Sequence, residues 1–165
     1  MRHLKKIQPD YIHSAFFGVE DSLISTTGAL AGIAIGSGNR SVILLTALVI
    51  IAVESTSMGA SEFISEETEE EIEKLKLPAN PKISGLLIFL SYVVAGLVPL
   101  APYLFLAPAQ AIPISVMLAL VGLTILGIVK GKLTKLNPLK SALEVLVIGG
   151  IATSIGIVVG IVFKV

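Results

Sequence analysis

Four carboxylates stand inside segments of the chain that are otherwise long and apolar. Glu20 and Asp21 lie in the first such segment, and Glu54 and Glu62 lie in the second. An ionised side chain at membrane depth costs roughly 2.5–3.5 kcal/mol on insertion scales, so such residues persist mainly beside water, a partner charge or a bound cation. Met58 lies between the two glutamates of the second segment and adds a soft sulfur to the hard oxygens. This combination indicates a transition-metal cation that crosses a membrane.

The composition places the chain among polytopic membrane proteins. Of its 165 residues, 54% are apolar and only 15% are charged, and the mean hydropathy is +0.91, more than a soluble globular domain needs. The formal net charge is zero, and no basic patch with interleaved aromatic residues indicates nucleic-acid binding. Cysteine is absent from the sequence, which excludes disulfide bonds and thiolate metal sites. We therefore expect an integral membrane protein with no permanently bound cofactor.

Hydropathy and helix-breaking residues divide the chain into five predicted transmembrane helices. Each is long enough, at 1.5 Å per residue, to cross a hydrocarbon core of about 30 Å. The predicted helices cover residues 14–36, 41–65, 82–107, 110–130 and 138–163. We expect a single all-α transmembrane domain over residues 1–165, in which residues 66–81 form a short acidic cytoplasmic loop.

The basic residues predict the orientation of these helices. With the N-terminus in the cytoplasm, only Arg40 and Lys164 of the 12 Lys and Arg residues lie outside, as the excess of positive charge on the cytoplasmic side requires. The cytoplasmic set is Arg2, Lys5, Lys6, Lys74, Lys76, Lys82, Lys130, Lys132, Lys135 and Lys140. The C-terminus is then outside, and every Asp and Glu lies within the membrane segments or on the cytoplasmic side.

Small residues form a stripe along the first predicted helix. Asp21 shares this stripe with Gly28, Gly32 and Gly36, because residues three and four apart lie on one face of a helix. The glycines make two overlapping GxxxG repeats, which let helices approach closely in lipid. The stripe predicts that Asp21 faces another helix. The repeats fit either helix packing within one chain or the seam of a homodimer.

The second predicted helix places Glu54, Met58 and Glu62 on one face. The two glutamates are about 12 Å apart along the helix axis, so a cation could step from one to the other past the thioether. Carboxylates suit Fe²⁺ and Mn²⁺, and the thioether disfavours Mg²⁺ and Ca²⁺. A metal must displace protons from carboxylates in a low-dielectric setting, so exchange of metal against protons is the expected coupling. Asp21 is a better candidate ligand than Glu20, which has only its depth in its favour.

The acidic run at residues 66–73 has two interpretations. It is either a solvated charged segment at the membrane surface or a site that gathers metal ions from the cytoplasm. The candidate gathering residues are Glu66, Glu69, Glu70 and Glu73.

The third and fourth predicted helices have no ionisable residue between Lys82 and Lys130 except tyrosine, so they are expected to be lipid-facing scaffold. Pro99 and Pro102 should kink the third helix or end its regular part.

With those residues identified, the chain resembles the vacuolar iron transporter family. Residues 17–25, F-G-V-E-D-S-L-I-S, are similar to the family pattern F-G-x-x-D-G-[LI]-[VI]-S. Residues 57–65, S-M-G-A-S-E-F-I-S, are similar to the pattern S-M-x-x-G-E-[YF]-[VIL]-S. Ser22 and Ser61 stand where these patterns have glycine. Larger members carry a glutamate-rich cytosolic metal-binding domain between helices 2 and 3, so the resemblance is to a short, prokaryotic-type member that lacks it.

The resemblance implies a homodimer of five-helix protomers that exports Fe²⁺, and often Mn²⁺, from the cytosol in exchange for protons. It also implies a pathway at the dimer interface, lined by the first helix, with Asp21, Met58 and Glu62 in contact with the metal. The expected location is the plasma membrane, or a vacuole-type membrane in a eukaryote. No fused ferritin-like domain with Glu-x-x-His spacing is present, and we expect a transporter and not an enzyme.

Two other functions fit the same residues. The chain could be a proton-coupled carrier of a different cation. It could also be a membrane assembly subunit that transports nothing and whose carboxylates only bind neighbouring helices. Substitution of Asp21 and Glu62 would separate these alternatives, because only transport requires the carboxylates after assembly is complete.

Overall fold

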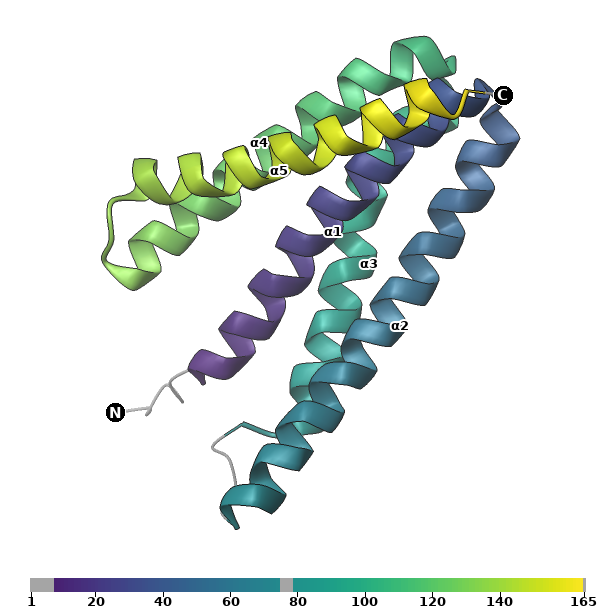
Figure 1. The fold of residues 1–165 in the computed structure, drawn as a ribbon. Helices are drawn as coiled ribbons and strands as arrows, with labels where there is room; N and C mark the ends of the chain where they lie inside the picture. The colour runs from purple at the N-terminus through teal and green to yellow at the C-terminus, as the bar shows by residue number, and fades with distance from the viewer. Residues whose placement is uncertain (1–7, 75–78, 165) are drawn as a thin grey trace.

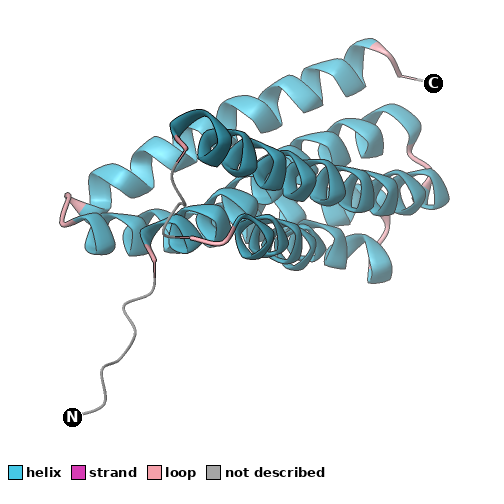
Figure 2. Ribbon diagram, turned by 90° about the horizontal axis from the view of Figure 1, so that it is seen from below, coloured by secondary structure: helices cyan, strands magenta, loops and turns pink. Residues whose placement is uncertain are grey.

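The computed structural model describes residues 8–74 and 79–164 as a bundle of α-helices. The helices are α1 (Pro9–Ser37), α2 (Arg40–Glu73), α3 (Pro81–Phe105), α4 (Pro108–Thr134) and α5 (Pro138–Val162). Figure 1 shows that α1, α2 and α3 lie together while α4 and α5 form a second pair. Figure 2 shows the short loops that join the helices at the two ends of the bundle. The predicted all-α fold is confirmed within these residues.

Proline and asparagine account for where the helices begin. Four of the helices have proline in their first two positions, where the missing N–H would have no partner in the helix. The exception, α2, begins after Asn39, whose side-chain oxygen accepts hydrogen bonds from the N–H groups of Ser41 and Val42 at 2.9 and 3.3 Å. Gly38 just before it has φ +58°, a left-handed conformation that favours glycine and lets α1 turn directly into α2.

The acidic run is helical and is not the loop that the sequence suggested. Helix α2 continues past Ser65 to Glu73, because glutamate is a good helix former and the run contains neither glycine nor proline. The candidate gathering residues therefore extend the face of the same helix that carries Glu54 and Glu62.

Helix α1 occupies the centre of the bundle. It packs against each of the other four helices, and it buries polar side chains, among them Ser14, Ser22 and Thr26. By length and composition, α2, α3, α4 and α5 are apolar enough to cross a membrane, whereas α1 is not among the helices that meet this criterion. Several hydroxyl residues of α1 are enclosed by its neighbours, whereas Glu20 and Asp21, which also lower its hydropathy, are half-buried.

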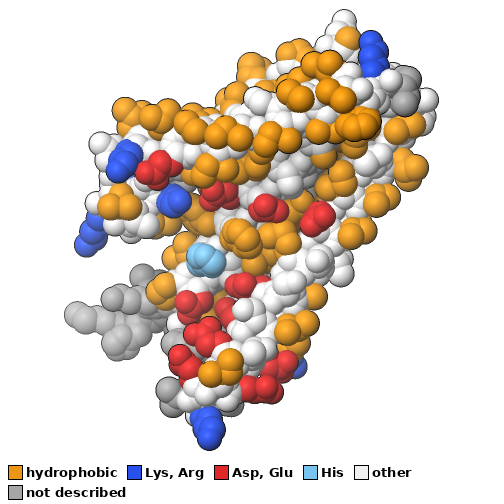
Figure 3. All heavy atoms as spheres, viewed as in Figure 1, with side chains coloured by type: hydrophobic (Ala, Val, Ile, Leu, Met, Phe, Trp, Pro, Cys, Tyr) orange, Lys and Arg blue, Asp and Glu red, His pale blue; other side chains and the backbone are white. Residues whose placement is uncertain are grey.

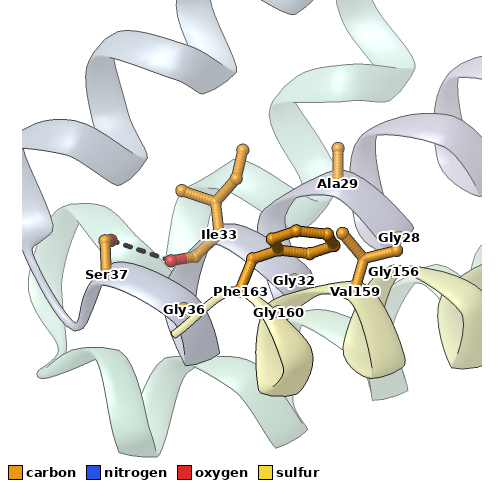
Figure 4. Close-up of a pocket in the computed structure, with 10 residues that line it drawn as sticks. All are labelled: Gly28, Ala29, Gly32, Ile33, Gly36, Ser37, Gly156, Val159, Gly160 and Phe163. Atoms are coloured by element: carbon orange, nitrogen blue, oxygen red, sulfur yellow. Dashed lines mark hydrogen bonds between the residues drawn. The ribbon is translucent and has the colours of Figure 1, made fainter. Parts of the chain in front are cut away.

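Glycines bring α1 against α5 within one protomer. A Cβ added at Gly156 would collide with the carbonyl oxygen of Gly28, and one at Gly160 would collide with that of Gly32. Figure 4 shows these residues along the contact, with a shallow cavity of about 430 Å³ on its outer side. The Ser37 hydroxyl beside it donates to the Ile33 carbonyl at 2.8 Å. The GxxxG repeats of α1 therefore have a packing partner in the same chain.

Helix α3 is more than the lipid-facing scaffold that its apolar sequence suggested, because only one of its faces, with Leu86, Leu90 and Val94, is exposed. It packs against α1, α2 and α4, and Tyr92 and Tyr103 on it are almost fully buried. Helix α3 also continues through both internal prolines to Phe105. The Ser115 hydroxyl of α4 donates to the Pro99 carbonyl at 2.7 Å, which satisfies a backbone acceptor at the proline segment.

The α1–α5 contact predicts opposite effects for two glycine substitutions in α5. Gly156→Ala should lower the midpoint of thermal unfolding in detergent, because overpacking against backbone costs about 1–3 kcal/mol. Gly150→Ala is the matched control, since nothing lies within 4 Å of an added Cβ there and alanine favours the helix. A Gly156→Ala variant as stable as Gly150→Ala would contradict the packing described here.

Candidate functional site

Asp21 and Glu54 form an acidic pair between α1 and α2, and Glu20 lies next to Asp21 on the α4 side of α1. Asp21 and Glu20 are half-buried on α1, and Glu54 is exposed on α2. The negative charges of Glu54 and Glu20 both act on Asp21, so the three carboxylates lie within electrostatic range of one another around Asp21. Figure 3 shows acidic side chains along this face of the molecule, over α1 and α2. Such a group of like charges favours a bound cation.

Tyr92 of α3 supports the α1 segment that carries Asp21. The Ser22 hydroxyl donates to the Tyr92 carbonyl at 2.7 Å, and the hydroxyls of Ser25 and Tyr92 are hydrogen-bonded at 2.8 Å. Both serines belong to the same motif as Asp21, so these bonds fix that motif against α3. Asp21 and Glu54 are also close enough to Tyr92 for their charges to interact with its phenol group.

Sequence reasoning missed Tyr92 because it treated its helix as apolar scaffold. A signal was present, since a tyrosine deep in an apolar helix needs a hydrogen-bond partner for its hydroxyl. Serines on a neighbouring polar helix are suitable partners, and α1 has them.

Glu62 lies in a second polar contact between α1 and α2, nearer the N-terminal end of α1. The Ser14 hydroxyl lies 2.9 Å from Oε1 of Glu62 and 2.9 Å from the carbonyl oxygen of Asp10, so its one proton is shared between them. Ser14 is fully buried, whereas Glu62 is half-buried. Glu62 is thus held against α1 while part of its carboxylate remains accessible.

Glu66 follows Glu62 by one helical turn, beyond the apolar part of α2. Its Oε2 atom and the Ser84 hydroxyl of α3 are both buried without a hydrogen-bond partner that meets standard geometry, although the two groups face each other. Burial raises the pKa of the Glu66 carboxyl, the Ser84 hydroxyl opposes this, and the charges of Glu62, Asp10 and Glu69 raise the pKa further.

The predicted residues of α2 form one line at four-residue steps. The line is half-buried at Met58, Glu62, Glu66 and Glu70. Its N-terminal member, Glu54, is exposed. The line is about 24 Å long at 1.5 Å per residue. It exists only because α2 continues to Glu73 as a helix. Glu69 and Glu73 are exposed beside this line.

The line does not form a closed metal cage. Among residues 8–74 and 79–164, no three His, Cys, Asp or Glu side chains come close enough together to hold a metal ion. The acids instead form successive small groups, with Asp21 near Glu54, and with Asp10 and Glu62 near Glu66.

Comparison with known proteins gives a consistent relationship. The VIT family model matches residues 12–81 and 74–161. The vacuolar iron transporter homolog 3 of Arabidopsis thaliana is 32% identical over 162 residues, which cover 88% of this chain and 79% of that protein. The vacuolar iron transporters 1 of Tulipa gesneriana and Eucalyptus grandis are 42% and 46% identical over 78 residues, 47% of this chain in each case.

Those shorter matches cover 32% and 31% of the Tulipa and Eucalyptus proteins, so this chain spans only part of their length. The family model and the Arabidopsis relative, in contrast, extend over most of this chain, and the family model includes both sequence motifs. The chain belongs to the VIT family.

Proposed function

We propose that this chain exports Fe²⁺, and secondarily Mn²⁺, from the cytoplasm in exchange for protons. The observation that carries the proposal is the line from Glu54 through Met58 and Glu62 to Glu66 and Glu70 on α2, beside the acids of α1. Membership of a family whose relatives are named vacuolar iron transporters supports iron as the cargo.

The donor set of the line suits a passing ion. Carboxylates alone would also accept Mg²⁺ and Ca²⁺, and the Met58 thioether shifts the preference towards softer first-row ions. Successive sites of one or two acids bind an ion weakly enough to release it to the next site, as conduction requires. The acids at the C-terminal end of α2 form the entrance of the metal pathway, and Asp21 with Glu54 forms its deepest metal site.

Protons are the counter-ion in this proposal. Each carboxylate that a metal occupies must first lose its proton, and each carboxylate that the metal leaves regains one in a low-dielectric setting. Movement of metal in one direction is therefore linked to movement of protons in the other. The half-buried acids along α2 give that exchange a series of sites.

All five helices cross the bilayer in this proposal, with the N-terminus in the cytoplasm, the C-terminus outside, and the plasma membrane as the location. Helix α1 crosses as a polar centre enclosed by the four apolar helices. Of the basic residues that support the orientation, Arg2, Lys5, Lys6 and Lys76 lie outside the described residues.

The working unit is a homodimer. The polar face of α2, made of Glu54, Ser57, Ser61 and Ser65, is exposed in the protomer. A charged residue exposed to lipid at this depth is costly, and a second copy that covers the face would enclose it in protein and water. The pathway then lies where this face meets its partner, beside Asp21.

Loss of the deep carboxylates should stop metal flux. In liposomes with an inward or outward Fe²⁺ gradient, Asp21→Asn and Glu62→Gln are each expected to lower the initial flux at least tenfold, because a neutral amide no longer attracts the cation. Glu144→Gln, at an exposed acid of α5, should transport normally. If both variants formed normal dimers and moved Fe²⁺ at the wild-type rate, the proposed pathway would be wrong.

Proton exchange has a separate test. Acid-loaded liposomes that contain the protein should lose their pH gradient when external Fe²⁺ or Mn²⁺ is added, measured with a trapped pH-sensitive dye. The same liposomes with Asp21→Asn should keep the gradient, as should protein-free liposomes. If metal entered the liposomes while the pH gradient stayed unchanged, the protein would still be a metal transporter, but protons would be excluded as its counter-ion.

The dimer interface can be tested by cross-linking, because the natural chain has no cysteine. A single Ser61→Cys substitution on the polar face of α2 should give a disulfide-linked dimer in native membranes after mild oxidation. Ser154→Cys, at an exposed serine of α5, should remain monomeric on the same gel. Cross-linking through Ser154→Cys but not Ser61→Cys would place the interface on another face.

A further inference from the structure

A cavity that the metal pathway does not use lies between the first turns of α1 and the last turns of α4. Its volume is about 510 Å³. Phe16, Phe17 and Leu133 provide apolar wall, and polar groups come from His13, Lys130, Thr134 and Glu20. The His13 and Phe17 rings are stacked, with centroids 6.1 Å apart and planes at 14°. The cavity therefore combines an apolar surface with hydrogen-bond donors.

A second cavity continues the apolar surface on the other side of Phe16. It has a volume of about 600 Å³ and is lined by α1, α3 and α4, with Val19, Leu90 and Leu126 among its residues. Phe16 lines both cavities. The two together have the form of a polar pocket joined to a long apolar groove along α4.

The end of the molecule that holds the polar pocket is basic. Helix α4 carries Lys130 and Lys132 near its end, and Lys135 follows at the turn. Figure 3 shows basic side chains, with an acidic one among them, at the α4–α5 end, next to the hollow that separates this end from α1. Basic pockets between transmembrane helices attract anionic lipid headgroups.

We propose that an anionic phospholipid occupies these two cavities. Its phosphate lies in the polar pocket, where Lys130 supplies the charge and His13 donates a hydrogen bond. One acyl chain runs past Phe16 into the apolar groove beside Leu126. Glu20 also lines the pocket and disfavours a second negative group there, so a headgroup with a single phosphate fits best. This assignment is independent of the metal pathway, which lies on the α2 side of α1.

The test uses phosphatidylglycerol and the intact chain in mild detergent. Native mass spectrometry should find phosphatidylglycerol retained on each protomer in preference to phosphatidylcholine, and added phosphatidylglycerol should raise the midpoint of thermal unfolding. Lys130→Gln should weaken phosphatidylglycerol binding roughly fivefold, the effect of one lysine at a charged lipid surface. Lys140→Gln is the matched control at the same end of the molecule and should bind normally.

Four results would overturn the proposal. These are equal retention of phosphatidylcholine, an equal thermal shift with inorganic phosphate alone, an unchanged affinity in Lys130→Gln, and an equal loss in Lys140→Gln. A second copy of the chain is the alternative occupant of the pocket. Disulfide-linked dimers of a Thr134→Cys variant in membranes would show that a second copy lies there and would overturn the proposal.

Discussion

The structure depends on enclosing one polar helix within four apolar ones. Helix α1 carries Asp21, Glu20 and several buried hydroxyls, and it contacts every other helix. Enclosure requires close approach, and the glycines of α1 and α5 supply it, since even a methyl group at Gly156 would collide with the backbone of Gly28. Tyr92 on α3 completes the enclosure through its bonds to Ser22 and Ser25. Asp21 itself is half-buried within this packing.

Helix α2, unlike α1, is not enclosed by the other helices and has an exposed polar face. It packs on α3 through Gly59 and Gly85, whose backbones approach closely, and this contact leaves its acidic line at the edge of α1. Glu62 is tied to α1 through Ser14, whereas Glu54 is exposed. The acids therefore lie between the protein interior and the exposed face of α2. A cation at such a position would be held by few protein ligands.

The sequence predicted the number of helices because long apolar runs separated by prolines, glycines and charges are a strong signal. The sequence did not predict where α2 ends, because hydropathy indicates which residues lie in the hydrocarbon core and not where a helix stops. Glutamates can continue a helix into water as readily as leucines continue it in lipid. That difference mattered, because Glu66 and Glu70 join the line of Met58 and Glu62 only on a continuous helix.

The role of α3 could not be predicted for a related reason. Its apolar residues suit lipid and protein neighbours equally, so composition does not distinguish a central helix from a peripheral one. The distinguishing contacts are single hydroxyls, Tyr92 to Ser25 and Ser115 to Pro99, which join residues far apart in the sequence or across a turn. Pairings of this kind depend on helix rotation, which a residue pattern alone does not define.

The position of the glycines also explains why the bundle is open at one end. On α1 the close contacts with α5 involve Gly28 and Gly32, both in its C-terminal half. Figure 1 shows that the α4–α5 pair diverges from α1 towards the other end, where bulky residues such as Phe16 and Phe17 line the cavity. A bilayer does not leave such a space empty, because exposed apolar walls are covered by lipid or protein. The close contact of α1 with α5 at one end and the opening beside Lys130 at the other are therefore consequences of one packing arrangement.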